Sequence, residues 1–355
     1  MVSLGLNSGL GLAGTGSAWF AGAAFTAADA NDGVARLAAF IADFRRDRHA
    51  MTTVAAASIA AATLDALVSP QSVAFSELFV FTRGSAAEYI DAAGVAQQAA
   101  ADVPRFDHRN GYRQLLLEGP ATNLFLNAFT PETQTVAVTN AAQYTVSCRG
   151  AGSLNLSGAA TGTVTQAAPV TFTATSTSLT LTVNGALSRV QLETGAAATS
   201  FVQTAATPAA RSADSCRLSP VGEALIQRGA ATLLLKGQGI SGSLGRLAGI
   251  GTGDEIMRLN TAQTNVIAGS SLSIASVTVP LPAFGVCLAW SAAGRSGSYN
   301  GGTIATDATV PAAAGQVFLG RNQAGLFAAG RYDSLTVWPF RASNAAIQAK
   351  ALAYS

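Results

Sequence analysis

Charged side chains are scarce in this sequence. Asp, Glu, Lys and Arg make up 11% of its 355 residues, whereas a typical soluble domain has about 25%. One explanation is a surface rich in Thr, Ser, Asn and Gln. The other, which we favour, is a surface largely covered in an assembly, because a monomer with so little charge tends to self-associate. The net charge of +2 gives no electrostatic reason to expect nucleic-acid binding.

Cysteine and histidine are also rare, and their scarcity excludes several kinds of site. Cys148, Cys216 and Cys287 lie far apart without CxxC or CxxH spacing, which excludes a disulfide scaffold and a zinc site of recognisable type. Buried free thiols are expected, and a Cys148–Cys216 bridge stays open. The only histidines are His49 and His108, and neither has the GxSxG partner that would indicate a Ser-His-Asp triad.

The N-terminal segment carries no charged side chain before Asp29. It is nevertheless a poor membrane helix, because it contains six glycines between residues 5 and 22 and each costs about 1 kcal/mol against alanine in a helix interior. It also lacks the positive start of a secretory signal. We expect neither a transmembrane span nor a signal peptide, but a flexible arm that orders against a partner.

Two helices are predicted after this arm. Residues 29–48 begin with Asp29 and Asp32 and end in arginines, which the helix dipole favours. Their apolar residues share one face: Val34, Leu37, Ile41 and Phe44. This face suits either a short coiled-coil seam or packing within the chain. A second, alanine-rich helix is predicted from about Val54 to Val68.

From about residue 130 the apolar residues recur with period two, which predicts strands. Leu179, Leu181 and Val183 alternate with Thr, and Asn184-Gly185 then predicts a tight hairpin turn. After residue 230, short apolar runs separated by Gly, Ser, Asn and Pro recur about every ten residues. This rhythm predicts antiparallel sandwiches or jelly rolls.

Four motifs in the middle of the chain carry a resemblance to a known family. They are FTRGSAAEYIDAAGV (81–95), VPRFD (103–107), LLLEGPATNLFLN (115–127) and VQLETGAAATSFVQTAATPAARSAD (190–214). Together they resemble a segment common in bacteriophage tail-fibre, head-spike and other virion surface proteins. In that family the segment leads into a β-sandwich like that of carbohydrate-binding modules. The resemblance therefore implies such a sandwich here.

A polar run, RFDHRNGYRQ (105–114), lies between two of these motifs. We interpret it as turns that order a connection, with Arg105, Asp107 and Arg109 paired locally or across a subunit contact. The apolar LLLE that follows predicts a strand that returns to a core. A metal site at Asp107 and His108 is disfavoured, because no third ligand lies nearby in the sequence.

The last part of the chain resembles laminin-G or concanavalin-like lectin folds, in AWSAAGRSGSYNGGTIA (289–305) and GRYDSLTVWPFRASNAAIQAKAL (330–352). The expected fold class is mainly β, with two antiparallel sandwich (jelly-roll) domains after a partly helical N-terminal anchoring region. The expected domains are the arm and helices (1–78), the motif segment with the first sandwich (79–228), and the second sandwich (229–355).

Sugar binding is the activity that this composition favours, since aromatic rings and a few polar side chains suffice for it. The candidate carbohydrate-binding residues lie in predicted loops of the last domain: Arg295, Tyr299, Asn300, Arg321 and Asn322. Trp290 and Trp338 follow apolar strands and are expected in the core. No catalytic residue, metal ion or cofactor is predicted; Asp254 and Glu255 are adjacent and would point to opposite faces of a strand, unlike the paired acids of a glycosidase.

The resemblance implies a non-enzymatic component of a phage or phage-like particle, made in the bacterial cytoplasm and displayed on the particle surface. Residues 1–78 would attach to other virion proteins of the tail or head, and the sandwiches would bind host surface polysaccharide. A homo-oligomer is expected, with a trimer as the first hypothesis. The alternative is a purely architectural virion protein whose sandwiches contact other subunits. A polysaccharide depolymerase is a third hypothesis.

Overall fold

The computed structural model describes residues 40–51, 71–227, 229–251, 254–260, 262, 265–268, 272–311 and 315–354. The chain forms two compact units. The terminal unit comprises Met1–Val80, Arg113–Leu115 and Cys216–Ser355, and the central unit comprises Phe81–Tyr112 and Leu116–Ser215. Both are built from antiparallel sheets, so the predicted mainly β, sandwich-like fold class is confirmed.

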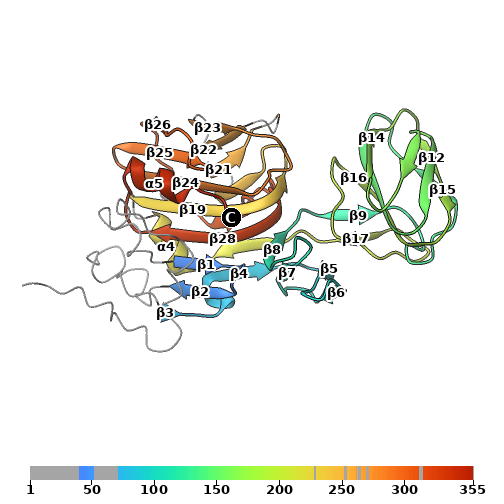
Figure 1. Ribbon diagram of the computed structural model, residues 1–355, viewed down its shortest axis with the longest axis horizontal. Coiled ribbons are helices and arrows are strands. Elements are labelled where there is room, and N and C mark those ends of the chain that lie inside the picture. Colours follow the sequence, from blue (N-terminus) through green and yellow to red (C-terminus); the bar gives the residue numbers. More distant parts are fainter. Residues whose placement is uncertain are drawn as a thin grey trace, which may run out of the picture. The chain divides into compact units, whose positions relative to one another are not determined.

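The terminal unit contains two large sheets (Figure 1). The first has the order β26 (Ala305–Asp307), β25 (Gly294–Tyr299), β24 (Phe284–Ser291), β19 (Ala231–Ser241), β28 (Ala329–Trp338), β1 (Phe40–Asp43), β2 (Arg48–Met51) and β3 (Gln71–Ser72), and β8 (Gln114–Leu117) also pairs with β28. The second has the order β23 (Leu272–Ser276), β22 (Asn265–Ala268), β21 (Asp254–Leu259), β20 (Arg246–Ile250), β27 (Val317–Leu319), β18 (Ser215–Leu218) and β4 (Phe79–Thr82). The helices of this unit are α3 (Phe75–Leu78), α4 (Pro220–Gln227) and α5 (Asn344–Lys350).

Strand β24 is buried on both faces, which explains its unbroken apolar sequence FGVCLAW. On one face the sheets meet closely, because a Cβ on Gly297 of the neighbouring strand would lie 2.9 Å from Ile274 of the second sheet. On the other face, Cys287 belongs to an apolar cluster with Ile347 of α5, the helix that lies against β24 and β25 (Figure 1). Trp290 and Trp338 are buried, as predicted.

The helix predicted over residues 29–48 is wrong for the part that the structure describes. Phe40–Asp43 (β1) pairs antiparallel with β28, and Arg48–Met51 (β2) pairs antiparallel with β1. Phe40 of β1 and Phe44, just after it, both contact Phe79, with ring centres 5.6 and 5.9 Å away. The apolar residues of this segment therefore also recur with period two, and pairing with β28 favours the strand. Residues 29–39 and the second predicted helix lie outside the described residues.

The compact units do not follow the domain boundaries expected at residues 79 and 229. Because β1 and β2 extend the sheet that contains β19 and β28, the described residues before 81 belong to the same unit as the C-terminal strands. The second sandwich is therefore completed by strands from the part of the chain that was expected to be a separate anchoring region.

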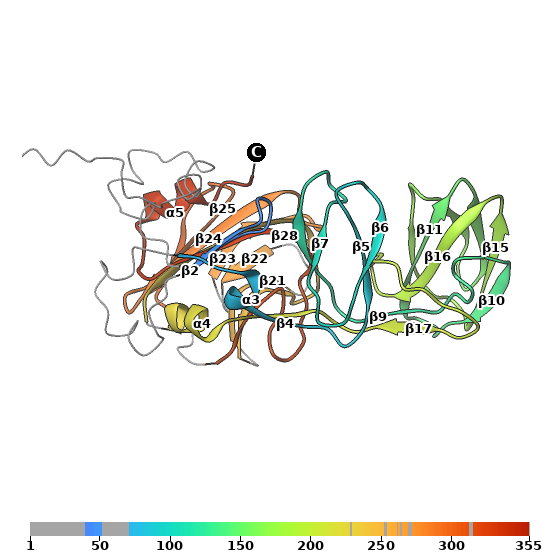
Figure 2. The same ribbon diagram turned by 90° about the horizontal axis from the view of Figure 1, so that it is seen from below.

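The central unit contains a smaller sandwich (Figure 2). One of its sheets has the order β10 (Gln134–Ala137), β15 (Ser178–Asn184), β12 (Ser153–Gly158) and β13 (Gly162–Val164), and the other has β14 (Val170–Thr173), β11 (Gln143–Gly150) and β16 (Leu187–Thr194). Short elements outside the sandwich are β5 (Ala87–Ile90) paired with β6 (Ala96–Ala99), β9 (Ala121–Asn123) paired with β17 (Ala209–Arg211), and β7 (Arg105–Asp107).

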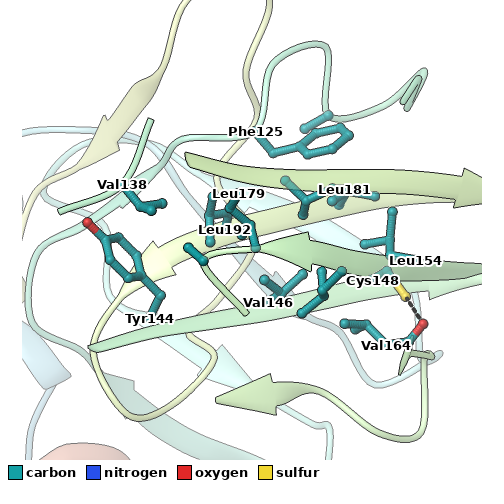
Figure 3. Close-up of a cluster of buried hydrophobic side chains, with 14 of the residues drawn as sticks. Phe125, Val138, Tyr144, Val146, Cys148, Leu154, Val164, Leu179, Leu181 and Leu192 are labelled. Atoms are coloured by element: carbon teal, nitrogen blue, oxygen red, sulfur yellow. Dashed lines mark hydrogen bonds between the residues drawn. The ribbon is translucent and has the colours of Figure 1, made fainter. Parts of the chain in front are cut away.

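The core of this sandwich follows the alternation in the sequence. Leu179 and Leu181 of β15 are fully buried and point toward Val146 and Leu192 of the opposite sheet (Figure 3). The threonines between them lie on the outer face of β15, where Thr180 bonds to Thr135 of β10 at 2.9 Å. The period-two pattern therefore predicted both the strands and their inward faces.

The hairpin predicted at Asn184-Gly185 is wrong in its pairing. Gly185 has the positive φ of 75° that the turn requires, but β15 pairs with β10 and β12, whereas β16 pairs with β11 and β14 lies beyond β11. The turn thus carries the chain from one sheet of the sandwich to the other. The turn residues were recognisable from the sequence, but they did not reveal which strand would pair with which.

Candidate functional site

Polar residues from all four motifs of the central unit meet in its interior. We call them the polar cluster: Arg83, Arg105, Glu118, Ser200, Arg211 and Asp214. Each is almost completely buried, and residues up to 131 positions apart in the sequence are in contact. The motifs therefore contribute to one three-dimensional feature, which explains why such a weakly charged chain places ionic residues there.

Arg105 is the centre of the polar cluster. Its guanidinium donates to Glu118 Oε2 at 2.8 Å, to Asp214 Oδ2 at 2.5 Å and to Ser200 Oγ at 2.7 Å. Asp214 also pairs with Arg83 through its other oxygen, at 3.1 Å. Bonds between ionised groups are the stronger class of hydrogen bond, so these contacts tie the motif segments firmly together.

Glu118 is held ionised although it is buried. Burial alone would raise the pKa of its carboxyl, but the guanidiniums of Arg105 and Arg211 outweigh this effect and hold the pKa well below its usual range. Ser200 adds two bonds, from its backbone N–H at 2.8 Å and its hydroxyl at 2.6 Å. A carboxylate fixed in this way suits a structural role and not proton transfer.

The amide side chain of Asn123 extends this hydrogen-bonded arrangement toward the sandwich. Asn123 donates to the carbonyl oxygens of Val190 and Val202 and accepts from the N–H groups of Phe125 and Leu192, all within 3.0 Å. All four hydrogen-bonding positions of this amide are thus used. Asn123 therefore anchors the chain entering the sandwich to the chain leaving it.

The interpretation of residues 105–114 as turns holds only for part of the segment. Arg105 and Asp107 lie in β7 and are buried, and Asp107 accepts from the backbone N–H of Ile90 at 3.0 Å. Arg105 pairs within the chain but not locally, because its partners are Glu118 and Asp214, the latter 109 residues away. The strand predicted at LLLE is confirmed, since its three leucines are buried in β8.

A cavity of about 460 Å³ opens on the polar face of β11 and β16 in the central unit. We call it the arginine pocket. Its lining consists of Ile90, Gly94, His108, Arg109, Ser147, Cys148, Arg149, Gln166, Pro169, Arg189, Gln191, Ala198, Thr199 and Phe201. These described residues include three arginines and neither Asp nor Glu, so the lining is positively charged.

The strand register places two of these arginines side by side. Arg149 of β11 is directly opposite Arg189 of β16, and Ser147 is opposite Gln191. Side chains two residues apart share a strand face, so all four lie on the face away from the sandwich core. Like charges directly opposite each other destabilise a sheet, so this pair needs an anion nearby.

Glu88 of β5 supplies one such anion. Its buried carboxylate accepts from Arg189 Nη1 at 2.5 Å, whereas Arg149 Nη2 is 3.7 Å away. Burial raises the pKa of Glu88 although Arg189, Arg149 and Arg109 act in the opposite direction. Of the two opposed arginines, Arg189 is thus the nearer partner of Glu88, and Asp107 is a second carboxylate that acts on Glu88.

Arg189 is also held by aromatic rings. Its guanidinium lies 5.3 Å from the ring centre of Phe129 and 5.2 Å from that of Phe201, which are cation–π distances. Arg149 differs: its side chain is 36% exposed, and in the described part of the chain its guanidinium donates no hydrogen bond. Arg189 is thus fixed in place, and Arg149 has donors to offer to a ligand.

Of the five predicted sugar-binding residues, three lie at or near β25. Arg295 is buried and makes a two-bond pair with Asp307, with both distances 2.8 Å. Tyr299 stacks on Phe284, with ring centres 5.9 Å apart, and burial raises its pKa to about 12. Asn300 is exposed in the following turn, where its side-chain oxygen accepts from Gly285 N at 2.7 Å.

The other two follow β27 in the second sheet. Arg321 lies over the rings of Phe318 and Phe327, 5.5 and 5.0 Å from their centres. Asn322 is buried, and its side-chain oxygen accepts from Leu326 N at 3.1 Å. The five residues are thus split between two sheets, each has its side chain engaged in local contacts, and none lines the arginine pocket.

The described residues offer neither a cluster of metal ligands nor an exposed thiol. The described residues contain no group of three or more His, Cys, Asp or Glu side chains that could hold a metal ion. The three cysteines are buried free thiols, and burial raises the pKa of Cys148 and Cys287. Within the described part of the chain, no helix is long and apolar enough to cross a membrane.

Sequence reasoning missed the arginine pocket. Its one local signal is the alternation in TVSCR and RVQL, where polar and apolar residues take turns and Arg149 and Arg189 fall on the polar positions. Nothing in the sequence indicates that the two strands are neighbours with these arginines in register, or that β5 brings Glu88 against them. Those facts come from the topology.

No family model and no curated protein matches this sequence. Solved structures with partial similarity include the sialidase of Trypanosoma rangeli, with 13% identity and a TM-score of 0.29 over 38% of this chain and 25% of that one. The same enzyme in complex with the inhibitor DANA has 11% identity and a TM-score of 0.29 over the same shares. This chain thus spans 25% of the length of these sialidases, and a likeness of this size assigns no activity to it.

Proposed function

We propose that this protein is a non-enzymatic surface component of a bacteriophage or phage-like particle that binds glycan on the host cell. The observation that carries the proposal is the polar cluster. The residues that resemble the virion-protein motifs are the ones that interlock there: Arg83 of FTR, Arg105 of PRFD, Glu118 of LLLE, and Arg211 and Asp214 of RSAD. A coincidental match of short motifs would give no reason for them to meet.

The arrangement of the central unit supports a binding role over catalysis. The carboxylates of the polar cluster are paired with arginines, and the arginine pocket has no carboxylate in its described lining. Glycoside hydrolysis commonly uses two carboxyl groups that face the same sugar bond. The pocket offers charged and hydroxyl groups in a concave site, which is what ligand binding requires.

Two measurements with the full-length chain test this proposal. Immunogold electron microscopy of particles from the bacterium that carries the sequence should place the C-terminus on the particle surface. Purified protein should also bind to host cells and compete with particles for adsorption. Particles without the chain would refute the proposal; labelled particles combined with no binding to cells would favour the architectural alternative.

Truncation at residue 229 is a poor substitute for these measurements. It would remove β19 and β28, which occupy the middle of the first sheet and pair with β1. A loss of adsorption would then report only the collapse of the terminal unit. Competition by the intact chain avoids this ambiguity.

A further inference from the structure

We propose that the arginine pocket binds a carboxylate-bearing saccharide, such as a uronic acid or a sialic acid. This inference rests on the proposed function, because it names the class of glycan that the particle would recognise. It assigns the ligand to the central unit and to a pocket whose arginines, Arg109, Arg149 and Arg189, lie outside the four sequence motifs.

The charge arrangement is the first argument. Arg149 and Arg189 face each other across β11 and β16, and Arg109 also lines the pocket. Glu88 is the nearest carboxylate and is bonded to Arg189. The described lining contains no carboxylate, and behind it Glu88 is hydrogen-bonded to Arg189 and Glu193 to Gln191 and Thr199. An anion in the pocket would therefore pair with Arg149 and relieve its repulsion from Arg189.

The available donors are the second argument. The planar guanidinium matches a planar carboxylate through two parallel hydrogen bonds. Arg149 makes no guanidinium hydrogen bond within the described residues, and Ser147, on the same face of β11, has a hydroxyl without a described partner. Gln166 Oε1 accepts from Gly150 N at 3.0 Å, which orients this side chain at the pocket wall.

The size and the remaining lining favour a sugar over a bare ion. A volume of about 460 Å³ is within the usual range for small-molecule pockets and is much larger than a lone anion needs. Phe201 and Pro169 contribute apolar surface, while Ser147 and Thr199 contribute hydroxyls. This mixture suits a ring that has both C–H faces and hydroxyl groups.

The experiment compares ligands that differ only in the carboxylate. Cellobiouronic acid and cellobiose share their rings and linkage, so we would titrate both into the full-length protein by NMR, together with sialyllactose and its neutral carboxamide. The acidic member of at least one pair should bind about tenfold or more tightly than its neutral counterpart, the size expected for a charge-assisted bond. Inorganic phosphate serves as the bare-anion control.

Variants locate the site. Arg149→Gln should lower the affinity for the acidic ligand about tenfold or more and leave that for the neutral ligand unchanged. Arg149→Lys should lower it less, because lysine keeps the charge but lacks the planar guanidinium that makes two parallel hydrogen bonds. Arg331→Gln, in the terminal unit, is the matched control and should bind normally. Circular dichroism confirms that each variant is folded.

The outcomes separate this inference from the proposed function. Equal binding of acidic and neutral members, unchanged binding in Arg149→Gln, or failure of every acidic ligand to bind would overturn the assignment of the pocket, even if the chain still adsorbs to cells. Phosphate that binds as tightly as the acidic sugars would also overturn it, because the site would then recognise a bare anion. Loss of cell binding by the unaltered chain would instead refute the proposed function.

Discussion

Replacing Asp214 by Asn should strongly destabilise the central unit. The carboxylate accepts from Arg83 at 3.1 Å, from Arg105 at 2.5 Å and from the backbone N–H of Glu118 at 2.8 Å, and it is almost fully buried. Asn has nearly the same shape but no charge. The change therefore leaves Arg83 without the carboxylate it pairs with, and Arg105 and Arg211 share that of Glu118.

The expected loss follows from this geometry. Removing one partner of a buried ion pair costs about 3–5 kcal/mol, because the other charge stays buried without compensation. At roughly 3 °C per kcal/mol for a domain of this size, the central unit should melt about 9–15 °C lower. Glu132→Gln changes the same charge at an exposed site of the same unit and should stay within about 0.5 kcal/mol.

Hydrogen exchange followed by mass spectrometry in increasing urea suits this test, because it assigns unfolding to peptides of one unit. Peptides from residues 116–215 should lose protection at lower urea in Asp214→Asn, and those from 284–338 should not. A loss below about 1 kcal/mol would show that water or rearrangement compensates the arginines, and the reasoning about the polar cluster would fail.

Three further predictions concern the terminal unit. Burial lowers the pKa of Lys236 from 10.5 to about 8, so stability due to this group should increase as the pH rises between these values; in Lys236→Met this slope should vanish from urea titrations followed by tryptophan fluorescence. Gly285→Ala would place a Cβ 2.5 Å from the carbonyl oxygen of Leu352 and should raise hydrogen exchange across α5. The fully buried thiols of Cys216 and Cys287 should resist a thiol reagent in the folded chain and react in urea.

The sequence predicted the fold class because burial in this chain is local and periodic. Leu179 and Leu181 alternate with threonine over a strand, and FGVCLAW is apolar throughout because both faces of β24 are covered. Such patterns need no knowledge of the partner strand. The same information was insufficient at Phe40–Phe44, because its apolar residues fit both a period of two and a helical spacing. Pairing with β28 decides in favour of the strand.

The candidate site could be predicted only in part. The motifs pointed to Arg105, and its pairing within the chain was expected. The arginine pocket depends on the register between Arg149 and Arg189 and on Glu88, which is 101 residues from Arg189. Contacts over such distances depend on topology, and residue type alone favoured the loops around Arg295 and Arg321, where the structure shows local contacts.

The burial of the polar cluster itself has a physical rationale. Apolar residues of similar volume often stabilise a core as well as a buried ion pair does, whereas an unpaired buried charge is strongly destabilising. The elements that the cluster connects, β5, β7, β9 and β17, are only three or four residues long, so each contributes few ladder hydrogen bonds to fix its own register. We infer that the cluster selects the arrangement of these segments, because a shift of any one of them would separate Arg83, Arg105 or Arg211 from its carboxylate and leave a buried charge unpaired.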